Sequence, residues 1–149
     1  MERVGRENGI LFSFGSKIGN SRDCHRLVLE FARPKGWQVE KHFIEKIFEW
    51  HFERDADITS HRDLAKMAMD AGVVQSSEEE ALAFLRAEKH SQEVHDLVAQ
   101  AKENGVMHVP TFEIHGRRIE GAEDASVFYE ALAGAKEDDR VQVVKGCAC

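Results

Sequence analysis

Residues Gly105–Gly116 read Gly-Val-Met-His-Val-Pro-Thr-Phe-Glu-Ile-His-Gly, and this segment is the most informative about the fold. From Val109 to Ile114 the run alternates with a period of two, which is typical of a strand. His115-Gly116 then supplies a tight turn, and Arg117–Glu120 runs back as a second strand. Pro110 lies inside the first strand and removes a backbone donor, which is unfavourable unless something compensates. Such local violations often mark functional sites.

Helical periodicity dominates the hundred residues before this hairpin. Apolar side chains recur there at spacings of three and four, and Ser-x-x-Asp and Ser-x-x-Glu patterns resemble capping boxes. These signals predict five helices: one from Asn20 or Ser21 that Pro34 and Gly36 stop, one from about Trp37 to Phe52, one from Ser60 to Gly72, a short one from Ser77, and one from about Gln92 to Asn104. The side chains predicted to face the core include Cys24, Leu27, Val28, Phe31, Phe43, Ile44, Ile47, Phe48, Leu64, Met67, Ala81, Leu85, Val94, Leu97 and Val98.

Two further elements are predicted at the ends of the chain. Ile10–Phe14 is a short aromatic and β-branched run closed by Gly15, which indicates a buried strand. Asp124–Leu132 has the spacing of a last amphipathic helix, and its inward side chains are predicted to be Val127, Phe128, Ala131 and Leu132.

Charge and composition exclude several classes of partner. Lys and Arg total 20 against 27 Asp and Glu, and no face collects the basic stripe that a phosphate backbone requires, so we expect no nucleic-acid partner. The apolar run after residues 1–8 is too short for a signal peptide or a membrane span. The three cysteines suggest no disulfide framework, which favours a reducing compartment. We therefore expect a cytoplasmic protein with no membrane partner.

Two motifs resemble one known family. The Pro110 segment resembles the cis-proline strand of thioredoxin-fold proteins of the DsbA type, and Ile119-Glu120-Gly121-Ala122 resembles the family's last strand and the residues leading to its last helix. Upstream, Asn20–Leu27 reads Asn-Ser-Arg-Asp-Cys-His-Arg-Leu and resembles an Asn-Thr-x-x-x-His-Arg-Leu stretch of the FrnE-like branch. Both motifs occur in the family's order and at its distance, so the resemblance covers about residues 5–133.

The resemblance implies a fold and an activity. The fold is α/β and thioredoxin-like, of the DsbA type, with an inserted helical subdomain at about residues 36–105. We expect a single domain over residues 1–134, followed by a polar tail over residues 135–149 that ends in Cys-Ala-Cys. The implied family activity is thiol-disulfide exchange or isomerisation.

The chain departs from this family in its cysteines. Family members begin with a strand and a Cys-x-x-Cys at the start of a helix, and this sequence contains no Cys-x-x-Cys. That helix lowers the pKa of the attacking cysteine through its N-terminal dipole, so the usual nucleophile is missing. We therefore expect an N-terminally truncated domain with weak or no redox activity. A truncated product of a longer gene, with Cys-x-x-Cys encoded upstream of Met1, is another interpretation.

Loss of the first strand would also leave two sheet edges open. In the family that strand lies between the Ile10–Phe14 strand and the cis-proline hairpin, and unpaired edges invite pairing with another chain. We expect Ile10–Phe14 either to shift and pair with Val109–Ile114 or to be completed by a second copy. A homodimer through the open edge is thus one expected assembly.

The candidate substrate-binding residues are Val109, Pro110 and Thr111. In the family the backbone of the residue before the cis-proline hydrogen-bonds an extended substrate segment, which here implies an extended peptide or a protein thiol client. The alternative is that Pro110 only shapes the strand. His108 stands where the family usually has a small residue, and its imidazole could narrow the groove.

The candidate redox thiols are Cys147, Cys149 and Cys24. Cys147 and Cys149 could shuttle a disulfide or bind a soft metal ion, although a tail with no function is the alternative. Cys24 lies in the first turn of its helix, where a thiolate is stabilised, but it also fits the apolar stripe as a small buried side chain. Eight scattered histidines contain no His-x-x-x-His pair, so we expect no metal site and no cofactor.

Two functions therefore remain open. The first is a divergent FrnE-like thiol-disulfide oxidoreductase whose catalytic segment is lost or is replaced by the C-terminal cysteines. The second is a non-catalytic module that binds an extended peptide or dimerises, using the cis-proline groove and the open sheet edge.

Overall fold

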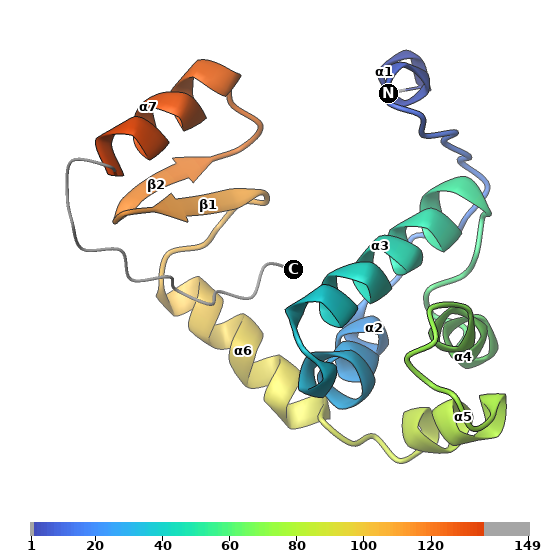
Figure 1. Ribbon diagram of the computed structural model, residues 1–149. Helices are drawn as coiled ribbons and strands as arrows, with labels where there is room; N and C mark the ends of the chain where they lie inside the picture. The colour runs from blue at the N-terminus through green and yellow to red at the C-terminus, as the bar shows by residue number, and fades with distance from the viewer. Residues whose placement is uncertain (1, 136–149) are drawn as a thin grey trace. The chain divides into compact units, whose positions relative to one another are not determined.

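The computed structural model describes residues 2–135, and these residues divide into two compact units. The helical unit ends at Val98 and the hairpin unit starts at Ala99. The helices are α1 (Glu2–Glu7), α2 (Arg22–Leu27), α3 (Trp37–Glu53), α4 (His61–Asp70), α5 (Glu78–Arg86), α6 (Ser91–Glu103) and α7 (Ala125–Ala135), and the strands are β1 (Thr111–Ile114) and β2 (Arg117–Glu120) (Figure 1).

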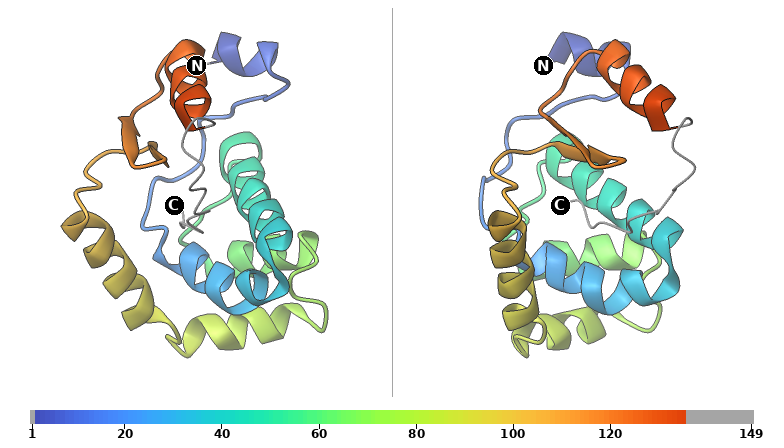
Figure 2. Two further views of the ribbon diagram at one scale, coloured as in Figure 1. Left: turned by 60° about the vertical axis from the view of Figure 1, so that its left-hand side comes forward. Right: turned by 90° about the vertical axis from the view of Figure 1, so that its left-hand side faces the viewer.

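The helical unit is built around one apolar core. Helices α2, α3, α4 and α5 pack against one another, as both views in Figure 2 show. Their buried side chains include Leu27, Val28, Phe43, Ile47, Leu64, Met67, Val73, Ala81 and Leu85. These are largely the residues that recur at spacings of three and four in the sequence, so the predicted helical faces are confirmed.

Serine caps begin two of these helices. The hydroxyl of Ser60 accepts a hydrogen bond from the Asp63 N–H at the start of α4. The hydroxyl of Ser77 does the same for the Glu80 N–H at the start of α5. Each cap satisfies one of the amide donors that a helix leaves without an intrahelical partner, and both follow the predicted Ser-x-x-acid patterns.

Helix α2 continues as a wider turn before the chain changes direction. Val28–Ala32 is a π-helical segment and Arg33–Lys35 is a 3₁₀ turn. Gly36 then has φ +103°, a conformation that L side chains rarely adopt, and α3 starts at the next residue. The Pro34-Gly36 stop predicted from the sequence is therefore confirmed.

The prediction of a strand at Ile10–Phe14 is wrong. These residues form an irregular segment fixed to the end of α3, where the Ser13 N–H donates to the Phe52 carbonyl at 2.7 Å. The Leu11 N–H donates to the Glu53 carboxylate at 3.1 Å. Because its backbone groups bond to a helix terminus, the segment does not extend the sheet, and the predicted shift onto Val109–Ile114 does not occur.

Helix α1 was not predicted. The Ile10 N–H donates to the Gly5 carbonyl and the Gly9 N–H to the Arg6 carbonyl, with Gly9 at φ +77°. This is a Schellman C-terminus, which satisfies the last carbonyls of a short helix. Gly5 is buried against the Phe12 ring, and a Cβ at this position would lie 2.5 Å from that ring.

The hairpin unit consists of a two-stranded antiparallel sheet and helix α7. Thr111 pairs with Glu120 and Ile114 with Arg117, so His115 and Gly116 form the turn, both with positive φ. Helix α7 lies over one face of the hairpin (Figure 1). The Phe112 and Phe128 rings pack edge to face there, with their centroids 4.9 Å apart. The predicted hairpin and last helix are confirmed.

Four core predictions are wrong. Phe48 of α3 is 55% exposed, Leu132 of α7 is 56% exposed, and Leu97 and Val98 of α6 are 37% and 48% exposed. All four lie at helical positions on a predicted apolar face, where spacing alone does not distinguish the centre of the face from its margin.

Candidate functional site

The segment before β1 brings the predicted substrate-binding residues to the surface. The Val109–Pro110 peptide bond is cis. The Pro110 carbonyl accepts a hydrogen bond from the Gly121 N–H at 2.7 Å, which extends the β1–β2 ladder by one pair. The Thr111 hydroxyl donates to the His108 carbonyl at 2.5 Å. The segment is thus fixed at both sides of Pro110, while the Val109 side chain is 77% exposed.

The outer edge of β1 has no strand beside it within residues 2–135. In a two-residue hairpin the pair next to the turn exchanges hydrogen bonds, and bonded and non-bonded pairs then alternate. The bonded pairs here are Ile114 with Arg117, Phe112 with Ile119, and Pro110 with Gly121. The backbone groups of Thr111 and Glu113 therefore point away from β2, toward the open edge.

Arg118 fixes the chain that leads into this segment. Its guanidinium donates to the Asn104 carbonyl at 2.7 Å and to the Gly105 carbonyl at 3.2 Å, at the C-terminal end of α6. A cation at this end of a helix interacts favourably with the helix dipole. Through Arg118, β2 is joined to the residues just before the exposed side chains of Met107 and Val109.

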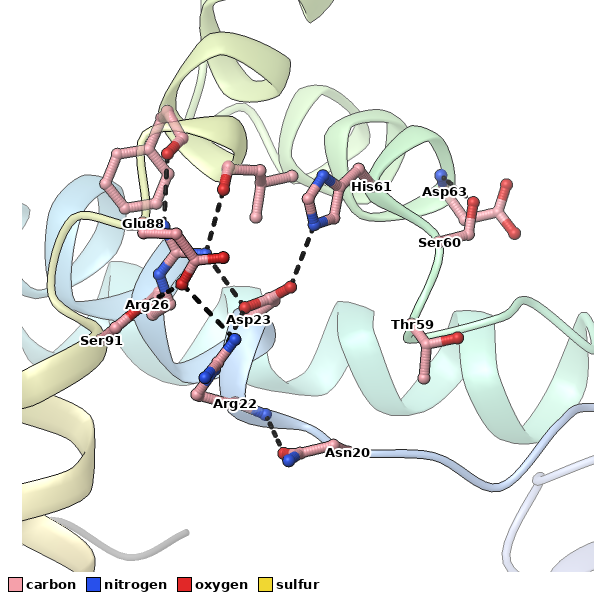
Figure 3. A network of polar contacts seen from close by, with 12 residues as sticks. Asn20, Arg22, Asp23, Arg26, Thr59, Ser60, His61, Asp63, Glu88 and Ser91 are labelled. Carbon is pink, nitrogen blue, oxygen red and sulfur yellow. Dashed lines mark hydrogen bonds and ion pairs between the residues drawn. The ribbon is translucent and has the colours of Figure 1, made fainter.

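The second motif of the sequence forms a polar network in the helical unit (Figure 3). Arg26 of α2 is fully buried and donates to the carbonyls of Phe84, Leu85 and Lys89, at distances from 2.7 to 3.3 Å. Its guanidinium also pairs with the Asp23 carboxylate at 3.0 Å. Arg26 therefore closes the C-terminal end of α5 and fixes α2 against it.

Asp23 connects this network to α4. Its second carboxylate oxygen lies 3.1 Å from Nε2 of His61, and Arg22 lies beside it (Figure 3). Burial raises the pKa of Asp23, but the hydrogen bonds and charges of Arg26 and His61 outweigh this, so the pKa lies below its ordinary value. Asn20, Arg22, Asp23 and Thr59 line a shallow polar depression at the edge of the network.

Of the three candidate redox thiols, the structure describes only Cys24. Cys24 is 5% exposed and belongs to the core of the helical unit, which matches the packing alternative for this residue. Cys147 and Cys149 lie outside the described residues. Cys24 belongs to the helical unit, whereas the Pro110 segment belongs to the hairpin unit.

No group of three or more His, Cys, Asp or Glu side chains within residues 2–135 is arranged to hold a metal ion. None of the helices in this part of the chain has the length and apolarity that a bilayer crossing requires.

Comparison with known proteins gives the class to which this fold belongs. The family model of the DSBA-like thioredoxin domain matches residues 1–133, which is most of the chain. The protein is a mixed α/β member of the thioredoxin-like class with a helical insertion. The chain belongs to the DSBA-like thioredoxin domain family. No curated protein matches it.

The buried Arg26 network was not predicted from the sequence. The His-Arg-Leu stretch resembles a family motif, but no sequence pattern reveals which carbonyls a buried arginine reaches. The available signal was an arginine between helical apolar positions, at Arg26 next to Leu27, where a charged residue is rarely fully buried without partners.

Proposed function

We propose that this chain is a divergent, FrnE-like member of its family that binds extended polypeptide along the outer edge of β1, with weak or no thiol-disulfide exchange activity. The observation that carries the proposal is the set of outward-directed backbone groups at Thr111 and Glu113, next to the exposed Val109. A peptide added there gains main-chain hydrogen bonds from β1, and alternate side chains supply specificity.

The surroundings of this edge support binding of an apolar-rich segment. Met107 is 70% exposed and Val109 77% exposed, and Phe112 remains 39% exposed beside α7. Exposed apolar side chains next to unpaired strand groups are a combination that isolated proteins usually avoid, because it promotes association.

Redox chemistry would need the C-terminal cysteines. In such a step, a Cys147 or Cys149 thiolate attacks a client disulfide and releases one client thiolate, and the second cysteine then closes a disulfide and releases the other. Two protein thiols are oxidised as the client disulfide is reduced to two thiols. The sequence gives these cysteines no helix N-terminus, so their thiolate fraction is expected to be low.

A single proline substitution at the open edge tests the binding proposal. Glu113→Pro removes an N–H that points away from β2, so the β1–β2 ladder stays intact, whereas Glu113→Ala removes only the side chain. The probe is reduced, alkylated insulin B chain, which is extended and cannot exchange disulfides. We expect E113P to bind this peptide about tenfold more weakly or worse, and E113A to bind it nearly as tightly as the wild type. NMR should show the hairpin contacts retained in both variants.

Two results would contradict the proposal. One is equal binding by E113P and wild type, and the other is equal loss of binding in E113P and E113A. A concentration-dependent sedimentation shift that E113P abolishes would instead assign the edge to a second copy of the chain. We infer a cytoplasmic location from the cysteine pattern of the sequence, and cell fractionation tests it.

A further inference from the structure

His90 joins two elements of the helical unit at the point where α6 begins. Its ring Nε2 lies 2.7 Å from a Glu30 carboxylate oxygen in the π-helical segment. Its Nδ1 lies 2.6 Å from a Glu93 carboxylate oxygen in the first turn of α6. The His90 carbonyl also accepts the Val94 N–H at 3.0 Å, which is an opening hydrogen bond of that helix.

The contacts with Glu30 and Glu93 together require one protonation state of the His90 ring. Ionised carboxylates can only accept hydrogen bonds, so each ring nitrogen of His90 must donate. Only the doubly protonated imidazolium has a proton on both nitrogens. When the ring carries a single proton, one of Glu30 and Glu93 faces a nitrogen lone pair instead of a donor.

The groups around His90 form a small set. Lys89 donates to the other Glu30 oxygen at 2.7 Å, and from α5 the Phe84 ring lies 6.2 Å from the imidazole. The Lys89 carbonyl is held by Arg26 of α2 at 2.7 Å. The side chain of His90 is 22% exposed and that of Glu30 26% exposed, so solvent screens these contacts only in part.

Glu30 remains ionised well below neutral pH. The pKa of Glu30 is lowered, and the hydrogen bond from Lys89 is the largest cause. Together with the His90 contact and the charges of both residues, it outweighs burial, which raises the pKa. The carboxylate side of the contact is therefore already present where imidazole side chains gain and lose their second proton.

The backbone at His90 adds a second reason why this contact matters. His90 has φ +62° and Glu88 has φ +55°, which are left-handed conformations that non-glycine residues adopt at an energetic cost. Interactions elsewhere must hold such a turn in place, and the paired carboxylates on His90 are positioned to do so.

We propose that His90, Glu30 and Glu93 form a proton-dependent clasp that anchors the start of α6 on the helical unit. The clasp is complete when both ring nitrogens of His90 carry a proton and Glu30 and Glu93 are ionised. It loosens as pH rises and the ring loses a proton. Because α6 carries the chain from the helical unit into the hairpin unit, the clasp sets how firmly that helix is fixed at its origin.

Amide hydrogen exchange across α6 tests the clasp, with protection factors that remove the intrinsic effect of pH. We expect the protection of residues 94–98 to fall about threefold to tenfold between pH 6 and pH 8 in the wild type. His90→Asn keeps a residue that tolerates positive φ but cannot gain a second proton, so its protection should not change with pH. His95→Asn, on an exposed position of the same helix, is the matched control and should behave as wild type.

A direct measurement keeps the test decisive if His90→Asn is poorly folded. The ¹⁵N shifts of the His90 ring in the wild-type chain should report protons on both nitrogens at pH 6, and their titration should coincide with the change in α6 protection. A singly protonated ring at pH 6, or the same loss of protection in His90→Asn, would overturn the proposal.

Discussion

Arg26 meets Phe84 twice, once through the backbone and once through the ring. Its guanidinium donates to the Phe84 carbonyl at 3.3 Å, and its central carbon lies 5.3 Å from the centroid of the Phe84 ring. The first contact uses the negative end of α5 and the second uses the ring's electron-rich face. Together with Asp23 they make a fully buried cation compatible with an apolar core.

Arg26→Met tests the structural weight of this network. Methionine fills a similar volume but leaves three carbonyls and Asp23 without their donor, so we expect a loss of about 3 kcal/mol in the free energy of unfolding. Urea unfolding, compared at equal slope, measures it. Arg86→Met, at the exposed end of the same α5, should change stability by less than about 0.5 kcal/mol. Equal effects of the two substitutions would show that burial of Arg26 is not what stabilises the fold.

Asp23 should make stability depend on pH in the acid range. Its folded pKa is lowered, so its contribution is present above the unfolded pKa of about 3.9 and is lost as pH falls through the folded value. Asp23→Asn should therefore lower stability at pH 7 by about 1 kcal/mol and flatten the decline below about pH 4. Chemical unfolding at a series of pH values measures both, with Asp96→Asn on exposed α6 as control. An unchanged acid slope in Asp23→Asn would contradict the assignment.

The serine caps should each have a measurable effect. Ser60→Ala and Ser77→Ala remove the acceptors of the Asp63 and Glu80 amides, and we expect each to reduce stability by about 1 kcal/mol. Ser60→Asp keeps an acceptor at the same position and should recover most of the loss. Thermal unfolding followed by circular dichroism is sufficient, and a Ser60→Asp variant no more stable than Ser60→Ala would argue against capping as the cause.

Disulfide reduction tests the redox part of the proposed function. We expect insulin reduction in the presence of dithiothreitol to proceed no faster with the protein than without it, because no cysteine of the described core combines exposure with an acidifying helix terminus. Cys24→Ser should leave this result unchanged. Turnover that disappears in a Cys147→Ser, Cys149→Ser double variant would assign catalysis to the C-terminal pair instead.

Local signals predicted most of the secondary structure. The caps at Ser60 and Ser77, the stop at Pro34-Gly36 and the turn at His115-Gly116 all act through their immediate neighbours, so a short stretch of sequence contains their physical cause. The hairpin register follows from the turn, and with it the outward direction of Glu113.

The wrong predictions have non-local causes. Ile10–Phe14 has strand composition, yet its donors bond to Phe52 and Glu53 some forty residues away, which no local pattern reports. The same holds for Arg26, whose carbonyl acceptors Phe84 and Leu85 lie in α5. For α1, the Asn8-Gly9 pair was a usable C-terminal signal, but six residues are too few to show helical periodicity.

The π-helical turn at Val28–Ala32 has a consequence for how the chain tolerates change in length. A π turn accommodates one more residue than an α turn, so this segment behaves as an absorbed insertion. Deleting one residue here would restore ordinary helical winding, and the residues on both sides would keep the helical faces they have now. The same deletion inside α3 would have no such turn to absorb it and would rotate the following residues by about 100°. A one-residue deletion is therefore best tolerated at Val28–Ala32, before the chain turns at Gly36 into α3.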